Sequence, residues 1–115
     1  MDEAEKKQIH QSFDEVVNMT PAKLEHWLDT PESHGVGMTR AGEDEAVGHK
    51  EGHRIVAIKR KRKSELTDDD YAHMRKVVGY VHRHMAQGGP AGDKEHSPWR
   101  YSLMNWGHDP LAGKA

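Results

Sequence analysis

Residues 55–85, IVAIKRKRKSELTDDDYAHMRKVVGYVHRHM, decide the fold. The stretch divides at Thr67, a typical helix N-cap, and the three aspartates after it place negative charge where the first amides of a helix favour it. After this cap, apolar residues recur at the helical spacing of three and four: Tyr71, Met74, Val78, Val81 and Met85. Before it, a second apolar face is formed by Ile55, Val56, Ile58 and Leu66. The pattern predicts a helical hairpin over about residues 49–66 and 68–87.

Two further helices are predicted before the hairpin. Residues 3–18 carry one apolar side, made of Ile9, Phe13, Val16 and Val17. Thr20-Pro21 then combines an N-cap with a proline at the first helical position, where the missing N–H costs nothing. The helix that it opens should run to about Asp29 and bury Leu24, Trp27 and Leu28.

Glycines and polar residues dominate the middle of the chain. We expect a flexible loop over about residues 31–47, where no periodicity survives. Gly48 and Gly52 follow it, and a glycine inside a helix costs about 1 kcal/mol relative to alanine. Because their spacing of four puts both on one face, we expect another backbone to approach the helix closely there.

The C-terminal part is aromatic. After the polar connector 88–98, large apolar side chains gather within eight residues: Trp99, Tyr101, Leu103, Met104 and Trp106. We expect this segment to fold back on the hairpin and close the core, with Asp109 capping a turn or pairing with Arg75 or His84. The rival interpretation makes it an exposed surface on which bases stack. Residues 111–115 should fray, and the whole chain, 1–115, is predicted to be one all-α domain.

Composition limits what this domain can be. The chain has 115 residues, of which 34% are apolar and 31% charged, so one thin core is expected. It has no cysteine, which excludes disulfides, thiolate metal sites and a cysteine nucleophile. No apolar run reaches the roughly 20 residues that span a bilayer, and no signal-peptide pattern is present. We expect a cytoplasmic protein without a membrane partner.

Charge is distributed unevenly along the chain. Residues 1–51 hold twelve acidic and five basic side chains, a balance of −7, whereas residues 52–88 hold four acidic and nine basic ones, a balance of +5. Such asymmetry suggests an anionic partner for the basic part. Alternatively, the acidic and basic regions face each other within the fold or across a dimer.

The run Lys59, Arg60, Lys61, Arg62 and Lys63, here called the basic segment, is the clearest functional candidate. On a helix, five successive residues cover every face except the buried stripe, so at least three should project to solvent and reach phosphates. Other cations of the hairpin would extend this surface: Arg54, Arg75, Lys76 and Arg83. In the opposing interpretation the run is a solvated helix end, whose positive charges are favoured by the helix dipole and by the aspartates after Thr67.

Metal binding and catalysis find little support. The chain has ten histidines, but His82 and His84 point roughly 200° apart on a helix, and no His-Glu-x-x-His is present. His49 and His53 have an interval of four without a recognisable third ligand. Nucleophile elbows, Walker loops and dinucleotide fingerprints are absent. We therefore expect no enzyme activity, no cofactor and no metal.

Several segments together resemble a known family. They are Thr20–Leu28, Gly48–Val56, Leu66–Val81 and, most specifically, Trp99–Pro110 with its Trp-Gly-His-Asp-Pro ending. The family consists of short bacterial proteins with a domain of unknown function, often labelled DNA-binding. The resemblance implies a self-contained domain in a bacterial cytoplasm or nucleoid, and it supplies no catalytic residues.

These observations favour a small DNA-associated protein. Phosphate contact through the basic segment is expected, with duplex DNA favoured and little sequence preference, because no side-chain pattern for reading bases is present. The alternative is a non-enzymatic protein-interaction domain or homodimeric scaffold domain that uses its acidic and basic halves.

Overall fold

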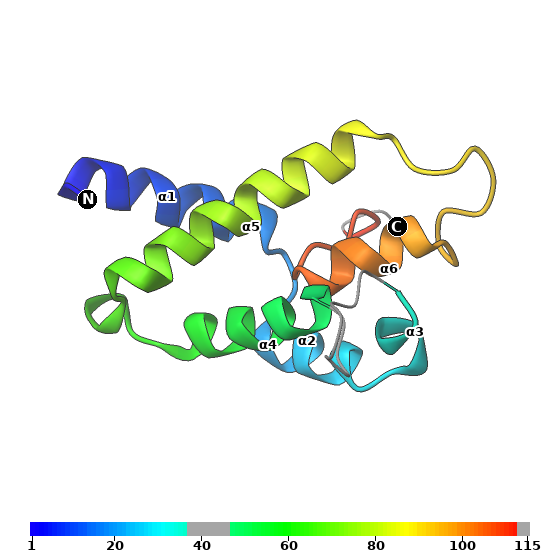
Figure 1. Ribbon diagram of the computed structural model, residues 1–115, viewed down its shortest axis with the longest axis horizontal. Helices are drawn as coiled ribbons and strands as arrows, with labels where there is room; N and C mark the ends of the chain where they lie inside the picture. The colour runs from blue at the N-terminus through cyan, green and yellow to red at the C-terminus, as the bar shows by residue number, and fades with distance from the viewer. Residues whose placement is uncertain (37–46, 113–115) are drawn as a thin grey trace.

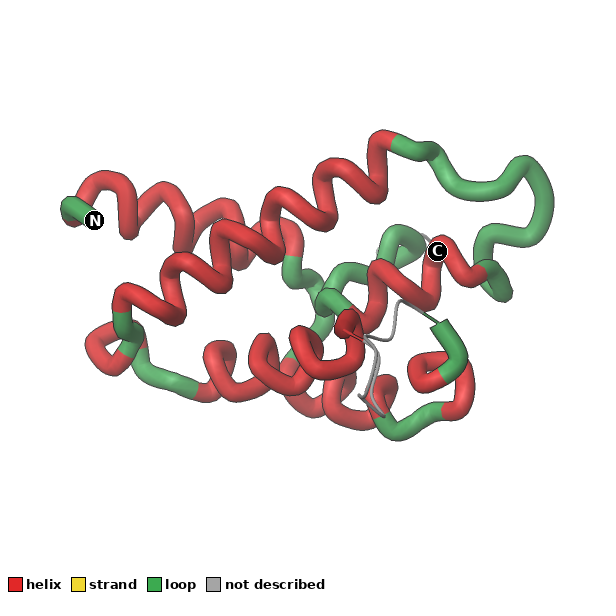
Figure 2. Tube along the Cα trace, viewed as in Figure 1, coloured by secondary structure: helices red, strands yellow, loops and turns green. Residues whose placement is uncertain are grey.

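A computed structural model describes residues 1–36 and 47–112 and is helical throughout its regular structure. Its helices are α1 (Glu3–Val16), α2 (Pro21–Leu28), α3 (Pro31–His34), α4 (Val47–Arg60), α5 (Asp68–Ala86) and α6 (Pro98–Asn105). Figure 2 shows helices and connecting turns, and no strand, in the part of the chain that is described. The predicted all-α class is confirmed.

The helices form two layers with α6 between them (Figure 1). α5 packs along α1, and α4 packs along α2, while α6 contacts helices of both layers. α4 and α5 run in opposite directions from the turn at Thr67, as the hairpin requires. Each hairpin helix therefore has its closest backbone neighbour in an N-terminal helix, and the core lies between the layers.

Three helices begin with the same sequence signal. The hydroxyls of Thr20, Thr30 and Ser97 each accept the N–H of the third residue onward, and a proline follows each cap. Only the first was predicted as a helix start. Thr30-Pro31 opens α3 where a loop was expected, and Ser97-Pro98 makes the aromatic segment a helix. The rest of the expected loop, residues 37–46, lies outside the described residues, as do residues 113–115 of the expected frayed end.

The prediction that the first hairpin helix runs to residue 66 is wrong, because α4 ends at Arg60. Arg62 is extended, with ψ at 151°, and its N–H donates to the Glu65 carboxylate at 2.8 Å across a short 3-10 turn, Lys63–Glu65. Like charges four residues apart, such as Lys59 and Lys63, disfavour a continued helix. Part of the basic segment therefore lies beyond the helix.

The core is formed mainly by the predicted apolar faces. Buried side chains come from every long helix: Ile9, Phe13, Val16, Leu24, Leu28, Ile55, Ile58, Tyr71, Met74, Val77, Val81, Leu103 and Trp106. Two positions of α5 differ from the prediction. Val77 is fully buried in place of the half-buried Val78, and Met85 is 37% exposed. Met85 lies in the last turn of α5, where Figure 1 shows that helix extending past α1.

α6 approaches α4 closely at the two glycines, as predicted. A Cβ atom at Gly52 would lie 2.4 Å from the backbone oxygen of Asn105 and 2.7 Å from a methyl of Leu28. One at Gly48 would lie 3.1 Å from the indole nitrogen of Trp106. Glycine at both positions therefore lets the C-terminal helix seat against α4.

Asn105 fastens this helix to the N-terminal half. Its side-chain oxygen accepts the indole N–H of Trp27 at 2.8 Å and the hydroxyl of Ser33 at 2.6 Å. Its amide nitrogen donates to the Ser33 carbonyl at 3.1 Å. Because Asn105 is fully buried, each of these bonds would be costly to leave unmade.

The aromatic segment closes the core. Trp106 is only 5% exposed, and its ring stacks on Tyr80 with the centroids 4.1 Å apart. Asp109 caps a turn by accepting the N–H of Leu111, as one prediction proposed. The proposed partners Arg75 and His84 are wrong: the guanidinium of Arg100 makes two hydrogen bonds of 3.0 Å to the Asp109 carboxylate. Arg100 lies in α6 itself, close to the turn that follows.

Candidate nucleic-acid interface

The basic segment lies at the end of α4 and in the exposed turn that leads toward α5. Lys59 and Arg60 belong to the helix, and the other three residues follow it. Lys59 is half-buried, whereas the remaining four are exposed. The prediction that all five charges lie on the faces of a regular helix is therefore wrong. Two of them lie in the last turn of α4, and three lie in the irregular turn that follows.

Most of the predicted binding residues have an acidic partner within the molecule. Among the described residues, six of the eight lie within 4.0 Å of a carboxylate oxygen. The pairs are Arg54–Asp70, Lys59–Asp14, Arg60–Glu25, Lys61–Asp70, Arg75–Glu5 and Lys76–Glu51. Four of these carboxylates belong to residues 1–51, so the acidic and basic regions face each other within the fold.

Asp70 is the buried member of this network. Its carboxylate receives the Lys61 ammonium at 2.7 Å and the backbone N–H of Thr67 at 3.0 Å, while its own N–H donates to the Thr67 hydroxyl. Burial raises the pKa of Asp70, but Lys61 and Thr67 outweigh this and hold the pKa below its ordinary value. Lys61 therefore helps to build the turn.

The other pairs are more exposed. Arg60 binds Glu25 through two hydrogen bonds, yet both side chains are 51% exposed. The Arg60 guanidinium lowers the pKa of Glu25 by that hydrogen bonding and by its charge. Exposed ion pairs of this kind stabilise a fold only weakly, so a phosphate can replace such a carboxylate at little cost.

Arg62 and Lys63 have no carboxylate partner among residues 1–36 and 47–112. Lys7 of α1 shares this property, and it lines a surface hollow together with Lys63. The structure thus brings one cation of the first helix beside the basic segment. Lys7 was not predicted as part of this surface, because it is far from the basic segment in sequence. It comes close only through the parallel packing of α1 on α5.

Glu51, His73 and Lys76 form a second polar cluster, between α4 and α5. His73 is 4% exposed, and its Nδ1 lies 2.9 Å from one oxygen of Glu51, while Lys76 lies 3.0 Å from the other. The Nε2 atom of His73 is buried without a hydrogen-bond partner in the described structure. Desolvation lowers the pKa of His73, and the charge of Glu51 acts in the opposite direction. The positive charges of Arg54 and Lys76 lower the pKa further.

The stability of the fold should therefore fall in mild acid. Because the native pKa of His73 is depressed, its contribution is complete above the unfolded pKa of about 6.5 and is lost as pH falls through the native value. Burial also lowers the pKa of His84, which adds to the same slope, whereas the hydrogen bond to Asp93 raises the pKa of the exposed His96, which opposes it. Urea unfolding between about pH 7 and pH 5 should show this loss, and His73→Gln should flatten it.

His82→Gln is the matched control for that measurement. His82 lies on the same helix but is exposed, so this change should leave the pH dependence of the unfolding free energy as in the wild type. Carboxylates with depressed pKa values titrate below about pH 4.5 and do not enter this window. If His73→Gln left the pH dependence of the unfolding free energy unchanged, His73 would not be the source of the acid destabilisation.

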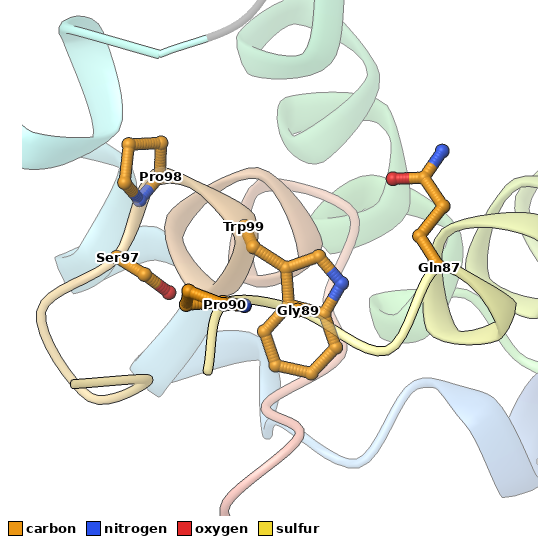
Figure 3. A pocket seen from close by; sticks show the side chains of 6 residues that line it. All are labelled: Gln87, Gly89, Pro90, Ser97, Pro98 and Trp99. Carbon is orange, nitrogen blue, oxygen red and sulfur yellow. The ribbon is translucent and has the colours of Figure 1, made fainter. Parts of the chain in front are cut away.

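A separate hollow lies where the connector after α5 meets α6 (Figure 3). It has a volume of about 350 Å³ and is lined by Gln87, Gly89, Pro90, Ser97, Pro98 and Trp99. Gly89 has φ at +71°, and a Cβ atom there would lie 2.7 Å from the Trp99 ring. The Trp99 indole N–H donates to the His84 carbonyl. Trp99 is thus half-buried and anchored through its indole N–H, which favours the structural interpretation of this segment over base stacking.

Three of the histidines lie side by side. The rings of His34, His49 and His53 are neighbours, with centroids 4.2 and 4.8 Å apart along the row. One ring nitrogen of His49 is 2.6 Å from the Leu28 carbonyl. Elsewhere Asp93, Glu95 and His96 come together on the surface, where such exposed groups are common without an ion. His34 was not predicted to lie near α4, because α3 was not expected.

The fold and its surface define a small all-helical domain with a polar exterior. Large apolar side chains exposed in the described ranges are Met1 and Met85. Over the same residues, no helix has both the length and the apolar character needed to cross a bilayer.

The chain belongs to a family described as proteins of unknown function (DUF3140), whose model matches residues 12–104. This confirms the resemblance to a domain of unknown function, although the match ends before the Trp-Gly-His-Asp-Pro sequence. No curated protein and no solved structure matches the chain.

Proposed function

We propose that this chain is a small DNA-associated, non-enzymatic protein that contacts nucleic-acid phosphates through the basic segment, with little sequence preference. The observation that carries the proposal is an uninterrupted run of five cations, four of them exposed, in which Arg62 and Lys63 have no carboxylate partner in the described structure. Lysine and arginine that neutralise phosphates release counterions, which drives binding without reading bases. A place at the nucleoid of a bacterial cell goes with this proposal.

The ion pairs of the basic segment reduce the number of phosphates that it is expected to contact. Lys61 is committed to the buried Asp70, whereas Arg60 is paired at an exposed site. We therefore expect two to three phosphate contacts, fewer than a fully free run of five would make.

A scaffold or homodimer built on opposite charges is less well supported. The acidic and basic halves already pair within one chain, so their charges are less available to a partner. Obligate interfaces are also more apolar than ordinary surface, and few large apolar side chains are exposed here. The polar exterior fits contact with a charged polymer better.

Salt dependence tests the proposal. Fluorescence anisotropy with a mixed-sequence duplex of about 20 base pairs should give a log–log slope of affinity against salt of about −2 to −3. The double change Arg62→Gln with Lys63→Gln should reduce that slope by about 2 and weaken binding at least about tenfold near 50 mM salt.

The control is a double variant with the same net charge, Lys23→Gln with Lys94→Gln. Both lysines are exposed and have no ion-pair partner among the described residues, and they lie in α2 and in the connector before α6. This variant should bind nearly as the wild type does. Equal losses in the two variants, or no binding of duplex or single strand at low salt, would contradict the proposal.

A further inference from the structure

The His10–Asp14 pair of α1 lines two surface hollows beside the basic segment. The larger, of about 510 Å³, is lined by Lys7, His10, Gln11, Asp14, Glu15 and Lys63. The smaller, of about 180 Å³, is lined by His10 and Asp14 together with side chains that include Lys59 and Lys61. We call the two hollows together the α1 groove. Lysines thus line both hollows.

Asp14 occupies the place in this groove that suits an anion. Its two carboxylate oxygens lie 3.2 Å from His10 Nδ1 and 3.7 Å from the Lys59 ammonium. The side chain is 52% exposed, so water and solutes reach it. Lys59 is held independently, because its ammonium also lies over the Phe13 ring, 5.8 Å from the centroid. The cation would therefore stay in place if the carboxylate moved away.

We infer that Asp14 is a built-in competitor of the nucleic-acid backbone. In the free protein its carboxylate neutralises Lys59 and faces His10, and a phosphodiester that enters the α1 groove displaces it from both. The inference rests on the proposed function. It adds that the phosphodiester binds in the α1 groove and that Asp14 lowers the affinity for it. The exchange replaces one monoanion with another, so the local charge balance is preserved.

Other carboxylates near the basic segment do not have this position. Asp70 is buried and closes the turn at Thr67 through hydrogen bonds, so it belongs to the fold. Glu25 binds Arg60 outside both hollows. Glu15 lines the larger hollow without an ion-pair partner among the described residues, and it adds repulsion without holding a cation. Among the carboxylates that the structure describes, Asp14 alone combines a place in the groove with a bound lysine.

Removing the competitor should tighten binding. In anisotropy titrations with the duplex near 50 mM salt, Asp14→Asn should raise affinity about three- to tenfold, and the gain should shrink at high salt as screening grows. Glu32→Gln is the matched control: it removes one exposed carboxylate from α3, far along the chain from the groove, and should change affinity much less. Both variants are surface changes, and circular dichroism melting checks their folding.

A second readout uses the wild-type protein. Addition of duplex should shift the NMR signals of the His10 ring, because its carboxylate neighbour is replaced. Two results would overturn the inference while the proposed function stands. In the first, the wild type binds duplex and Asp14→Asn raises the affinity no more than Glu32→Gln does. In the second, duplex binds but the His10 signals do not shift. Absence of duplex binding by all three proteins would contradict the proposed function, and the inference with it.

Discussion

Replacing Trp106 with alanine should lower the free energy of unfolding by about 3 to 5 kcal/mol, the range seen when a buried tryptophan is truncated. Trp106 is buried, stacks on Tyr80, and its indole lies against Gly48 of α4. Total stability for a domain of this size is about 5 to 15 kcal/mol, so one change removes a large share. Urea or thermal unfolding followed by circular dichroism measures the loss.

Trp106→Phe provides the graded comparison for this prediction. It keeps a ring that can stack on Tyr80 and loses the indole nitrogen and part of the buried area, so its cost should be clearly smaller. Any nucleic-acid binding by Trp106→Ala should fall only in proportion to unfolding. An unchanged melting temperature combined with selective loss of binding would place the binding site in the C-terminal helix.

Gly52→Ala should be the most damaging change of a single small side chain, costing about 2 to 3 kcal/mol. The added methyl meets the Asn105 backbone oxygen at 2.4 Å, and backbone cannot move aside as a flexible side chain can. The same change would gain about 1 kcal/mol of helix propensity at an open site. A steric cost that exceeds this gain would show that the contact between α4 and α6 fixes the fold.

Gly92→Ala is the control for that experiment. Gly92 lies in the connector after α5, and a Cβ atom there would meet no atom within 4 Å. Its unfolding free energy should match the wild type within about 0.5 kcal/mol, as for other open surface positions. If Gly52→Ala were equally neutral, α6 could not sit as close to α4 as the structure places it.

The fold was largely predictable where periodicity and capping act locally. The apolar faces of α1 and α5 and the cap at Thr67 depend on neighbours in sequence, and the helix starts at Thr20 and Thr67 were found from them. The starts at Thr30 and Ser97 carry the same cap-and-proline signal but precede short helices. α3 has only four residues, which is too short to show a helical period. α6 is as long as α2, but its apolar residues were interpreted as an aromatic cluster and not as one face of a helix.

The candidate site was predicted less completely, because its charges are paired over long sequence distances. Nothing in the sequence joins Lys59 to Asp14 or Arg60 to Glu25, since these contacts depend on how α1 and α2 pack. The alternative that acidic and basic regions meet within the fold accounts for them. Lys7 and Asp14 were missed for the same reason, and only the packing of α1 brings them to the basic segment.

The proposed contact with nucleic acid can be mapped residue by residue. A titration of the ¹⁵N-labelled protein with a short mixed-sequence duplex near 50 mM salt should shift amide signals of residues 59–63 and of α1 from Lys7 to Glu15. Signals around the hollow at Trp99 should stay in place, and salt should reverse the shifts. Shifts concentrated at α6 and the preceding connector, or none at a duplex concentration well above that of the protein, would contradict the account.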